Sequence, residues 1–168
     1  DITYSGMVSP TTGYVRLNRF SRNTTSEMNE AFKDLIESDV KEVIIDLRDN
    51  GGGLLTAAVN IIDMLIEKGQ TIVSTKGRMK ESNRSFLSRT KPIIEKDVKI
   101  AILINQGSAS ASEIVAGSIQ DLDRGIVIGR KSFGKGLVQT LYPIDKIRSL
   151  KVTTARYYIP SGRFIQNN

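Results

Sequence analysis

The sequence predicts a mixed α/β fold, and three observations lead to this fold class. Short apolar, β-branched runs alternate with segments whose apolar residues recur at helical spacing, which gives the order strand, helix, strand, helix, strand. Two of the predicted helices begin directly after glycine-rich or serine-rich loops that follow strands. No internal repeat or low-complexity linker divides the 168 residues, a length that suits one domain. We therefore expect a single α/β domain over residues 1–168.

The first half of the chain contains two amphipathic helical patterns. Thr24 and Glu27 have the spacing of a capping box. The apolar residues of the helix that follows fall on one face: Met28, Ala31, Phe32, Leu35 and Ile36. Gly69 is expected to end the second helix. The predicted elements are a strand at 13–17, a helix starting near 24, a strand at 42–46, a helix from about 54 to 68 and a strand at 71–74.

The second half contains one more helix and most of the remaining strands. Residues 76–96 are polar and basic, which is typical of a loop or a mobile flap. Residues 105–109 are small and are expected to form a turn. The predicted elements are a strand at 99–104, a helix from about 110 to 122, and strands at 126–128, 136–142 and 151–159.

The composition excludes several kinds of catalytic site. The chain has no Cys and no His. A thiol nucleophile, a disulfide, a Cys/His zinc site and a Ser-His-Asp triad are therefore impossible within it. Any hydrolytic chemistry must use Lys, Asp, Glu or Tyr as its base, and we expect no metal and no cofactor.

The net charge of +6 does not point to nucleic acid, because the basic residues are scattered and do not alternate with aromatic ones. No apolar run approaches the roughly 18 residues of a membrane span. The chain begins at Asp1 with no basic-then-apolar signal segment, so we interpret it as a mature fragment or an excised domain.

Three segments carry candidate chemistry, and the first is the loop Asp46–Gly53. Three consecutive glycines after a strand allow the backbone to adopt positive φ and to approach a ligand closely. Their N–H groups lie at or near a helix start, where anionic groups are stabilised. The alternative is a tight strand-to-helix turn with no further role.

The second segment, Asn105–Glu113, contains three serines at the start of the third helix. Each of these serines could be a simple helix cap. Ser110 differs from the other two because it lies where the turn ends and the helix begins. A hydroxyl there can project into a cleft beside the N–H of Ala111, which is the geometry of a nucleophile next to an oxyanion hole.

The third segment, Ser132–Gln139, places Lys135 between two glycines. If a strand follows, Lys135 and Gln139 share one face, and the Gln amide could orient the lysine amine. A surface turn lysine is the alternative. The stretch 129–135 also matches the start of a phosphate-binding loop, but Gly136 stands where that motif needs Ser or Thr, and the following residues favour a strand over a helix.

Taken together and in this order, these segments resemble the C-terminal processing (tail-specific) proteases, a family of serine peptidases. The resemblance is carried by DLRDNGGGLL, ILINQGSASASEIVAG, SFGKGLVQT and YYIPSGR, and it extends over nearly the whole chain from Gly13 onward. It implies a crotonase/ClpP-like spiral of β-β-α units. It also implies a peptidase core that acts on protein or peptide substrates in the bacterial cell envelope or periplasm. A PDZ domain before the core and a continuation after PSGR, both usual in the family, are absent from this sequence.

The resemblance also implies roles for single residues. Ser110 would be the nucleophile, Lys135 the general base, and Gln139 the residue that orients the lysine. The oxyanion hole would combine the N–H of Ala111 with that of Gly52 or Gly53. Ser110 would attack a peptide carbonyl to form an acyl-enzyme, and water would then hydrolyse it.

Two other functions compete with this interpretation. A non-catalytic member of the same fold would bind peptides or act as a scaffold, and Ser110 would then not react with a fluorophosphonate. A crotonase-like enzyme acting on acyl-CoA would use two oxyanion N–H groups, but it would not need Ser110, Lys135 and Gln139 together.

Overall fold

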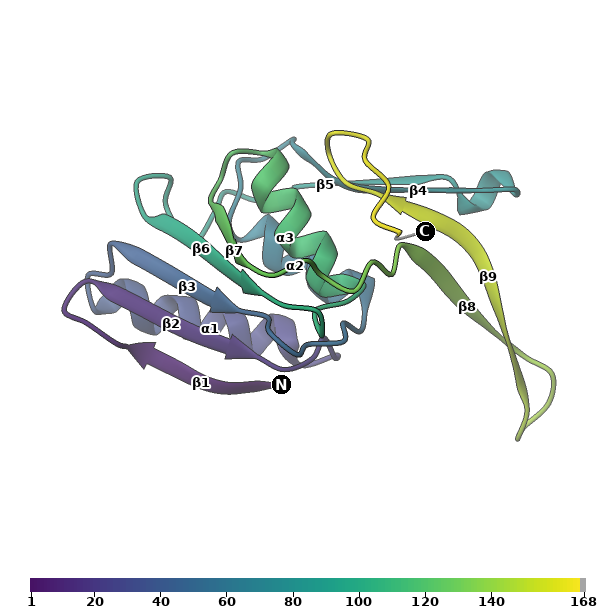
Figure 1. Ribbon diagram of the computed structural model, residues 1–168, viewed down its shortest axis with the longest axis horizontal. Coiled ribbons are helices and arrows are strands. Elements are labelled where there is room, and N and C mark those ends of the chain that lie inside the picture. Colours follow the sequence, from purple (N-terminus) through teal and green to yellow (C-terminus); the bar gives the residue numbers. More distant parts are fainter. Residues whose placement is uncertain (167–168) are drawn as a thin grey trace.

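Two β-sheets and three helices make up the computed structural model, which describes residues 1–166 (Figure 1). The five-stranded sheet has the order β1-β2-β3-β6-β7, and the four-stranded sheet has the order β5-β4-β9-β8. The strands of the first sheet are β1 (Ile2–Met7), β2 (Thr12–Leu17), β3 (Glu42–Asp46), β6 (Lys99–Ile104) and β7 (Ile126–Gly129). The other strands are β4 (Thr71–Gly77), β5 (Arg84–Leu87), β8 (Leu137–Pro143) and β9 (Ser149–Tyr158). The helices are α1 (Thr24–Glu37), α2 (Leu55–Asp63), α3 (Ala111–Asp121) and a short 3₁₀ turn, η1 (Lys80–Ser82).

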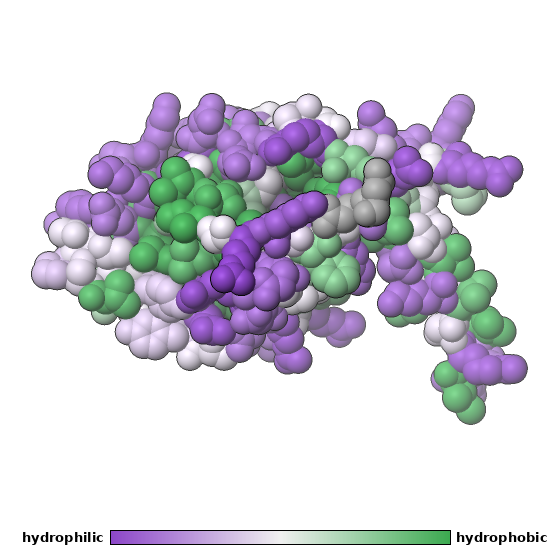
Figure 2. Space-filling model, in the orientation of Figure 1, coloured by the Kyte–Doolittle hydropathy of each residue, from purple (hydrophilic) through white to green (hydrophobic). Residues whose placement is uncertain are grey.

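The five-stranded sheet is parallel except at its edge, where β1 runs antiparallel to β2. Alternate residues of β3 and β6 enter the hydrophobic core on the side of the helices. Figure 1 shows α1 behind β2 and β3, so the opposite face is turned toward the viewer. On that face Figure 2 shows an apolar patch over β6, β3 and β7. The predicted α/β class is confirmed, and strands and helices alternate along the chain as the crotonase/ClpP-like type requires.

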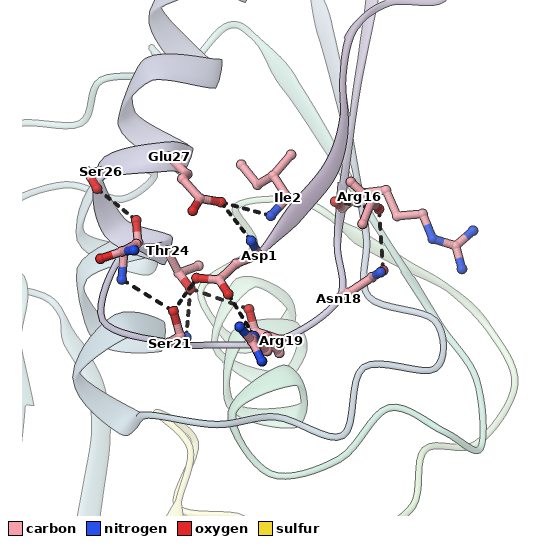
Figure 3. Close-up of polar contacts among 11 residues, drawn as sticks. Asp1, Ile2, Arg16, Asn18, Arg19, Ser21, Thr24, Ser26 and Glu27 are labelled. Carbon is pink, nitrogen blue, oxygen red and sulfur yellow. Dashed lines mark hydrogen bonds and ion pairs between the residues drawn. The ribbon is translucent and has the colours of Figure 1, made fainter.

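The start of α1 differs from the predicted capping box. Asn23 is the N-cap residue and Thr24 is already inside the helix. The Thr24 hydroxyl donates to the Asp1 carboxylate at 2.7 Å, and Glu27 accepts from the Ile2 N–H at 2.9 Å (Figure 3). Both side chains therefore tie β1 to α1, and β1 itself was not predicted from the sequence.

Two further predictions from the sequence were wrong: the end of the second helix and the loop at 76–96. The helix α2 ends at Asp63 and not at Lys68, because Met64, Leu65 and Ile66 are buried in a non-helical turn that continues the apolar pattern. The segment predicted as a loop at 76–96 contains the end of β4, η1 and β5. Strand β5 pairs antiparallel with β4 at an exposed sheet edge, where a polar sequence is tolerated.

No helix among the described residues is long and apolar enough to cross a membrane.

Candidate active site

The three candidate segments meet at one edge of the five-stranded sheet. Strands β3, β6 and β7 are parallel neighbours, so the loops that follow them leave from the same side. These loops are residues 47–53, 105–110 and 130–136. In open α/β sheets this carboxyl edge is the usual place for a ligand.

The glycine loop is held in place by the buried side chain of Asn50. Its amide nitrogen donates to the Leu17 carbonyl at 2.8 Å, and its amide oxygen accepts the Gly52 N–H at 2.9 Å. Gly52 has a φ of +94°, and a Cβ there would lie 2.6 Å from the Ala109 oxygen and 2.9 Å from the Ser110 Cβ. Only glycine lets the backbone come this close to Ser110.

The three serines differ in whether their hydroxyls donate a hydrogen bond. Ser108 is buried, and its hydroxyl donates to the Leu47 carbonyl at 2.7 Å. Ser112 is also buried, and its hydroxyl donates to the Asn50 carbonyl at 2.9 Å. Both hydroxyls connect the serine segment to the glycine loop. The Ser110 side chain is half-buried, and its oxygen takes part in a capping box with the Glu113 N–H. Within residues 1–166 its hydroxyl donates no hydrogen bond, so its proton is not engaged.

The backbone of Ser110 is strained. Its φ of +55° and ψ of −111° are unusual for a residue other than glycine. Such a conformation costs on the order of 1–3 kcal/mol and is concentrated at functional sites. Ala111 follows as the first residue of α3, where the N–H has no helical acceptor, and this nitrogen is 2.9 Å from the position of a Cβ on Gly52.

Glu113 connects the serine segment to the lysine segment. Its carboxylate is buried and accepts four hydrogen bonds. One oxygen accepts the N–H groups of Ser110 and Lys135, both at 2.8 Å. The other accepts the Ser132 hydroxyl at 2.7 Å and the Gly134 N–H at 2.6 Å. The backbone of Lys135 is thereby held at a fixed position relative to that of Ser110.

Lys135 and Gln139 lie differently from the predicted arrangement. Lys135 is half-buried and precedes β8, which starts at Leu137. The Gln139 amide donates to the Thr153 hydroxyl on β9 at 2.6 Å. Within the described part of the chain, the Lys135 amine makes no hydrogen bond to Ser110 or to Gln139. Phe133, two residues before Lys135, is 61% exposed and does not shield the lysine from water.

Asp46, at the end of β3, is a second buried carboxylate near the glycine loop. It accepts three hydrogen bonds from the Arg48 guanidinium, at 2.9, 3.1 and 2.6 Å, and one from the Tyr14 hydroxyl at 2.5 Å. Burial alone would raise the pKa of Asp46, but the hydrogen bonds from Arg48 and Tyr14 outweigh it and lower the pKa to about 2. Burial and the neighbouring Asp46 raise the pKa of Tyr14. Asp46 therefore carries its negative charge at neutral pH and holds Arg48, the second residue of the loop 47–53.

A groove with a volume of about 410 Å³ lies between α2 and the four-stranded sheet. Leu55, two residues after Gly53, and Val138, three residues after Lys135, both line it. Its remaining lining is Thr75, Met79, Glu81, Ser82, Arg84, Phe86, Thr140, Tyr142, Thr154 and Ala155. The groove is mainly apolar and starts beside the glycine and lysine segments.

The buried carboxylates at this edge of the sheet hold neighbouring backbone and side-chain groups in place. Glu113 and Asp46 are both saturated with donors. Among residues 1–166 no group of three or more Asp or Glu side chains could hold a metal ion.

The sequence interpretation missed Glu113, Asp46 and Arg48 as site residues. A signal for Glu113 was present, because Ser110 and Glu113 have capping-box spacing and the Glu113 carboxylate does bind the Ser110 N–H. The contacts of Glu113 with the lysine segment have no signature in the sequence.

Comparison with known proteins identifies the family of this chain. The model of peptidase family S41 matches residues 11–168. A carboxy-terminal-processing protease of Bartonella bacilliformis is 46% identical over 158 residues, which cover 92% of this chain and 36% of that protein. A chloroplastic C-terminal processing peptidase of Tetradesmus obliquus is 38% identical over 150 residues, covering 89% of this chain and 32% of that protein.

The solved structure of a photosystem II D1 C-terminal processing protease superposes with a TM-score of 0.82 at 37% identity, over 92% of this chain and 39% of that one. The chain thus spans about a third of the length of the relatives it matches. Because the family model covers nearly all of the sequence, and the relatives exceed 30% identity over about nine-tenths of it, the chain belongs to peptidase family S41.

Proposed function

We propose that this chain is the catalytic core of a serine endopeptidase that cleaves proteins or peptides near their C-terminal tails. The observation that carries the proposal is the state of the three serines. Ser108 and Ser112 are buried and their hydroxyls donate to backbone carbonyls, whereas the Ser110 hydroxyl donates to no described residue and lies on a strained backbone beside the Ala111 N–H and Gly52. This is the arrangement that a nucleophile beside an oxyanion hole requires.

In the proposed reaction Lys135 is the base, because the chain has no His. The neutral Lys135 amine takes the Ser110 hydroxyl proton while the oxygen attacks the peptide carbonyl carbon. The resulting oxyanion accepts the Ala111 N–H and a glycine N–H. The protonated amine then gives its proton to the departing peptide nitrogen, which leaves an acyl-enzyme on Ser110. Water, deprotonated by the same amine, releases the acid and restores the serine.

The second oxyanion donor is assigned to Gly53. The Gly52 N–H already donates to Asn50, and this supports Gly53 over Gly52. Gly52 would then provide the open space in front of Ser110. Gln139 would orient the lysine amine only after exchanging its Thr153 partner, so its proposed role needs a rearrangement at the start of β8.

The groove beside the site supports a peptide substrate. It is apolar, and β8 is the edge strand of its sheet, so an extended peptide could pair with it. A location in the bacterial cell envelope or periplasm is part of the proposal and is based on the family resemblance. The similar proteins named above include one from a bacterium and one described as chloroplastic.

The test uses the complete natural polypeptide and two peptides that differ only in a free or an amidated C-terminus. We expect faster cleavage of the free peptide, no cleavage by Ser110→Ala, and normal cleavage by Ser38→Ala, which removes an exposed hydroxyl far from the site. A fluorophosphonate should label Ser110 and neither Ser108 nor Ser112. Labelling of another serine would overturn the assignment.

One observation favours the non-catalytic alternative, a peptide-binding or scaffold protein. The Lys135 amine does not contact the Ser110 hydroxyl in the described residues, and Gln139 is bound to Thr153. Absence of both cleavage and labelling, with peptide binding retained, would establish that alternative.

A further inference from the structure

The ribbon formed by β8 and the first part of β9 ends in an exposed apolar tip. We define the ribbon tip as residues 141–151. Figure 1 shows the ribbon protruding from the body of the molecule, and Figure 2 shows apolar side chains along it and near its end. Ile147 is 95% exposed, and Leu141 and Ile144 are 65% and 63% exposed. Isolated exposed apolar residues are ordinary, but a cluster of them at the end of a protrusion is typical of an interaction site.

The apolar side chains surround the tip on several sides. Tyr142 pairs with Leu150 across the ribbon, whereas the neighbouring Leu141 pairs with Lys151. Successive strand residues point to opposite faces, so Tyr142 and Leu150 lie on one face and Leu141 lies on the other. A protein that bound one face of the ribbon would leave the other apolar face in water. If the tip instead entered an apolar layer end first, the layer would cover both faces.

Four backbone N–H groups at the end of the tip find acceptors within the tip. The N–H groups of Ile144 and Asp145 donate to the Arg148 carbonyl at 2.9 and 3.3 Å. The Asp145 carboxylate accepts the N–H groups of Ile147 and Arg148 at 2.9 and 2.8 Å and pairs with the Arg148 guanidinium at 2.6 Å. The single acid of the tip is therefore neutralised internally. Each of these internal hydrogen bonds lowers the cost of moving the tip into a medium with little water.

The tip is also basic. It contains Lys146, Arg148 and Lys151 but only one acidic residue, Asp145. Neither Lys146 nor Lys151 forms an ion pair with any residue that the structure describes. Basic side chains next to exposed apolar ones fit a surface of anionic lipid headgroups above acyl chains.

We propose that the ribbon tip docks on an anionic lipid surface. Ile144 and Ile147 enter the boundary between headgroups and acyl chains, and Lys146 and Lys151 bind the headgroups. The seven residues of β8 lie between Lys135 and Ile144, so the candidate active site is held roughly 20 Å above the lipid. The docking does not depend on the proposed peptidase activity and can be measured with a Ser110→Ala protein.

The test is co-sedimentation of the complete polypeptide, carrying Ser110→Ala, with vesicles of phosphatidylcholine alone or mixed with phosphatidylglycerol. We expect binding to the mixed vesicles that weakens as salt rises. The double variant Ile144→Ser/Ile147→Ser should bind at least about tenfold more weakly. Val8→Ser/Ile126→Ser, which removes two exposed aliphatic side chains elsewhere, should bind like the parent protein. Lys146→Glu/Lys151→Glu should also bind more weakly than Lys33→Glu/Lys68→Glu, which has the same net charge.

A second measurement reports the position of the tip directly. The chain has no cysteine, so Ile147→Cys can carry a single environment-sensitive fluorophore within it. Its emission should shift to the blue with mixed vesicles, while the same label at Val8→Cys should not shift. A parent protein that stays in the supernatant, or vesicle binding that is unchanged in the tip variants, would overturn the proposal. A protein partner for the tip would give the first of these results.

Discussion

Replacing Glu113 by Gln tests whether this carboxylate positions the lysine relative to the serine. The carboxylate accepts bonds from four donors, and an amide nitrogen cannot accept any of them. The least costly orientation turns the new NH₂ toward Ser132, whose hydroxyl can rotate and accept. The buried Gly134 N–H then loses its acceptor. Ser110 and Lys135 keep a neutral acceptor in place of a charged one.

The expected loss follows from these bonds. An unsatisfied buried donor costs about 1–3 kcal/mol, and a bond to a neutral acceptor is about 1 kcal/mol weaker than a bond to a charged one. The sum is about 3 kcal/mol, which corresponds to roughly a hundredfold fall in kcat/KM if it opposes the reactive arrangement. We expect the fall in kcat and little change in KM, because Glu113 does not line the groove beside the site.

The assay measures initial rates on a fluorogenic peptide with a free C-terminus, fluorophosphonate labelling of Ser110, and urea unfolding of the same preparations. Glu42→Gln is the control, because Glu42 accepts a hydrogen bond from Thr12 at the other end of β3. A folded Glu113→Gln protein with unchanged kcat and unchanged labelling would refute the positioning role.

Three further predictions concern the same edge of the sheet. Gly52→Ala should abolish activity and destabilise the fold, because the new Cβ would overlap Ala109 and Ser110. Gly51→Ala should be nearly neutral, because nothing lies within 4 Å of a Cβ at that position. Cleavage rates and the urea midpoints of unfolding, measured for both variants, test this difference. The pKa of Asp46 is about 2 in the folded chain against a usual value of 3.8, so its roughly 2 kcal/mol contribution to stability should be complete above about pH 4 and be lost as the pH falls toward 2. Urea unfolding across this range should therefore show Asp46→Asn losing less stability than the parent, and equal losses would contradict the assignment. Lys135→Arg should be nearly as inactive as Lys135→Ala, because a guanidinium does not give up its proton, while Gln139→Ala should retain more activity; a fully active Lys135→Arg enzyme would disprove the mechanism.

The parallel strands and the three helices were predictable because their signals are local. β-Branched runs such as Glu42–Asp46 and Lys99–Ile104 form buried strands, and the spacing of Met28, Ala31 and Leu35 forms a helix face. The end of α2 was not predictable from periodicity, because Leu65 is buried equally well in a turn.

The meeting of the three loops follows from parallel pairing, whereas the contacts within the site depend on distant partners. The Gln139 amide lies against Thr153 because β8 pairs with β9 in a register that includes an irregularity after Val138. Nothing near Gln139 in the sequence indicates that partner. Glu113 likewise has two roles, a local one as a helix-start residue and a distant one toward Gly134 and Lys135, and only the first has a sequence pattern.

The hydrogen bonds that hold the candidate site together also determine at which stage of folding the site can form. Asn50 binds Leu17, Ser112 binds Asn50, and Glu113 binds Lys135, so the site closes contacts 33, 62 and 22 residues apart in sequence. Closing such loops costs entropy that only a nearly complete sheet can offset. An unfinished or partly unfolded chain therefore has the residues of the site without its geometry. In a newly made molecule the candidate site is therefore assembled only when folding is almost complete.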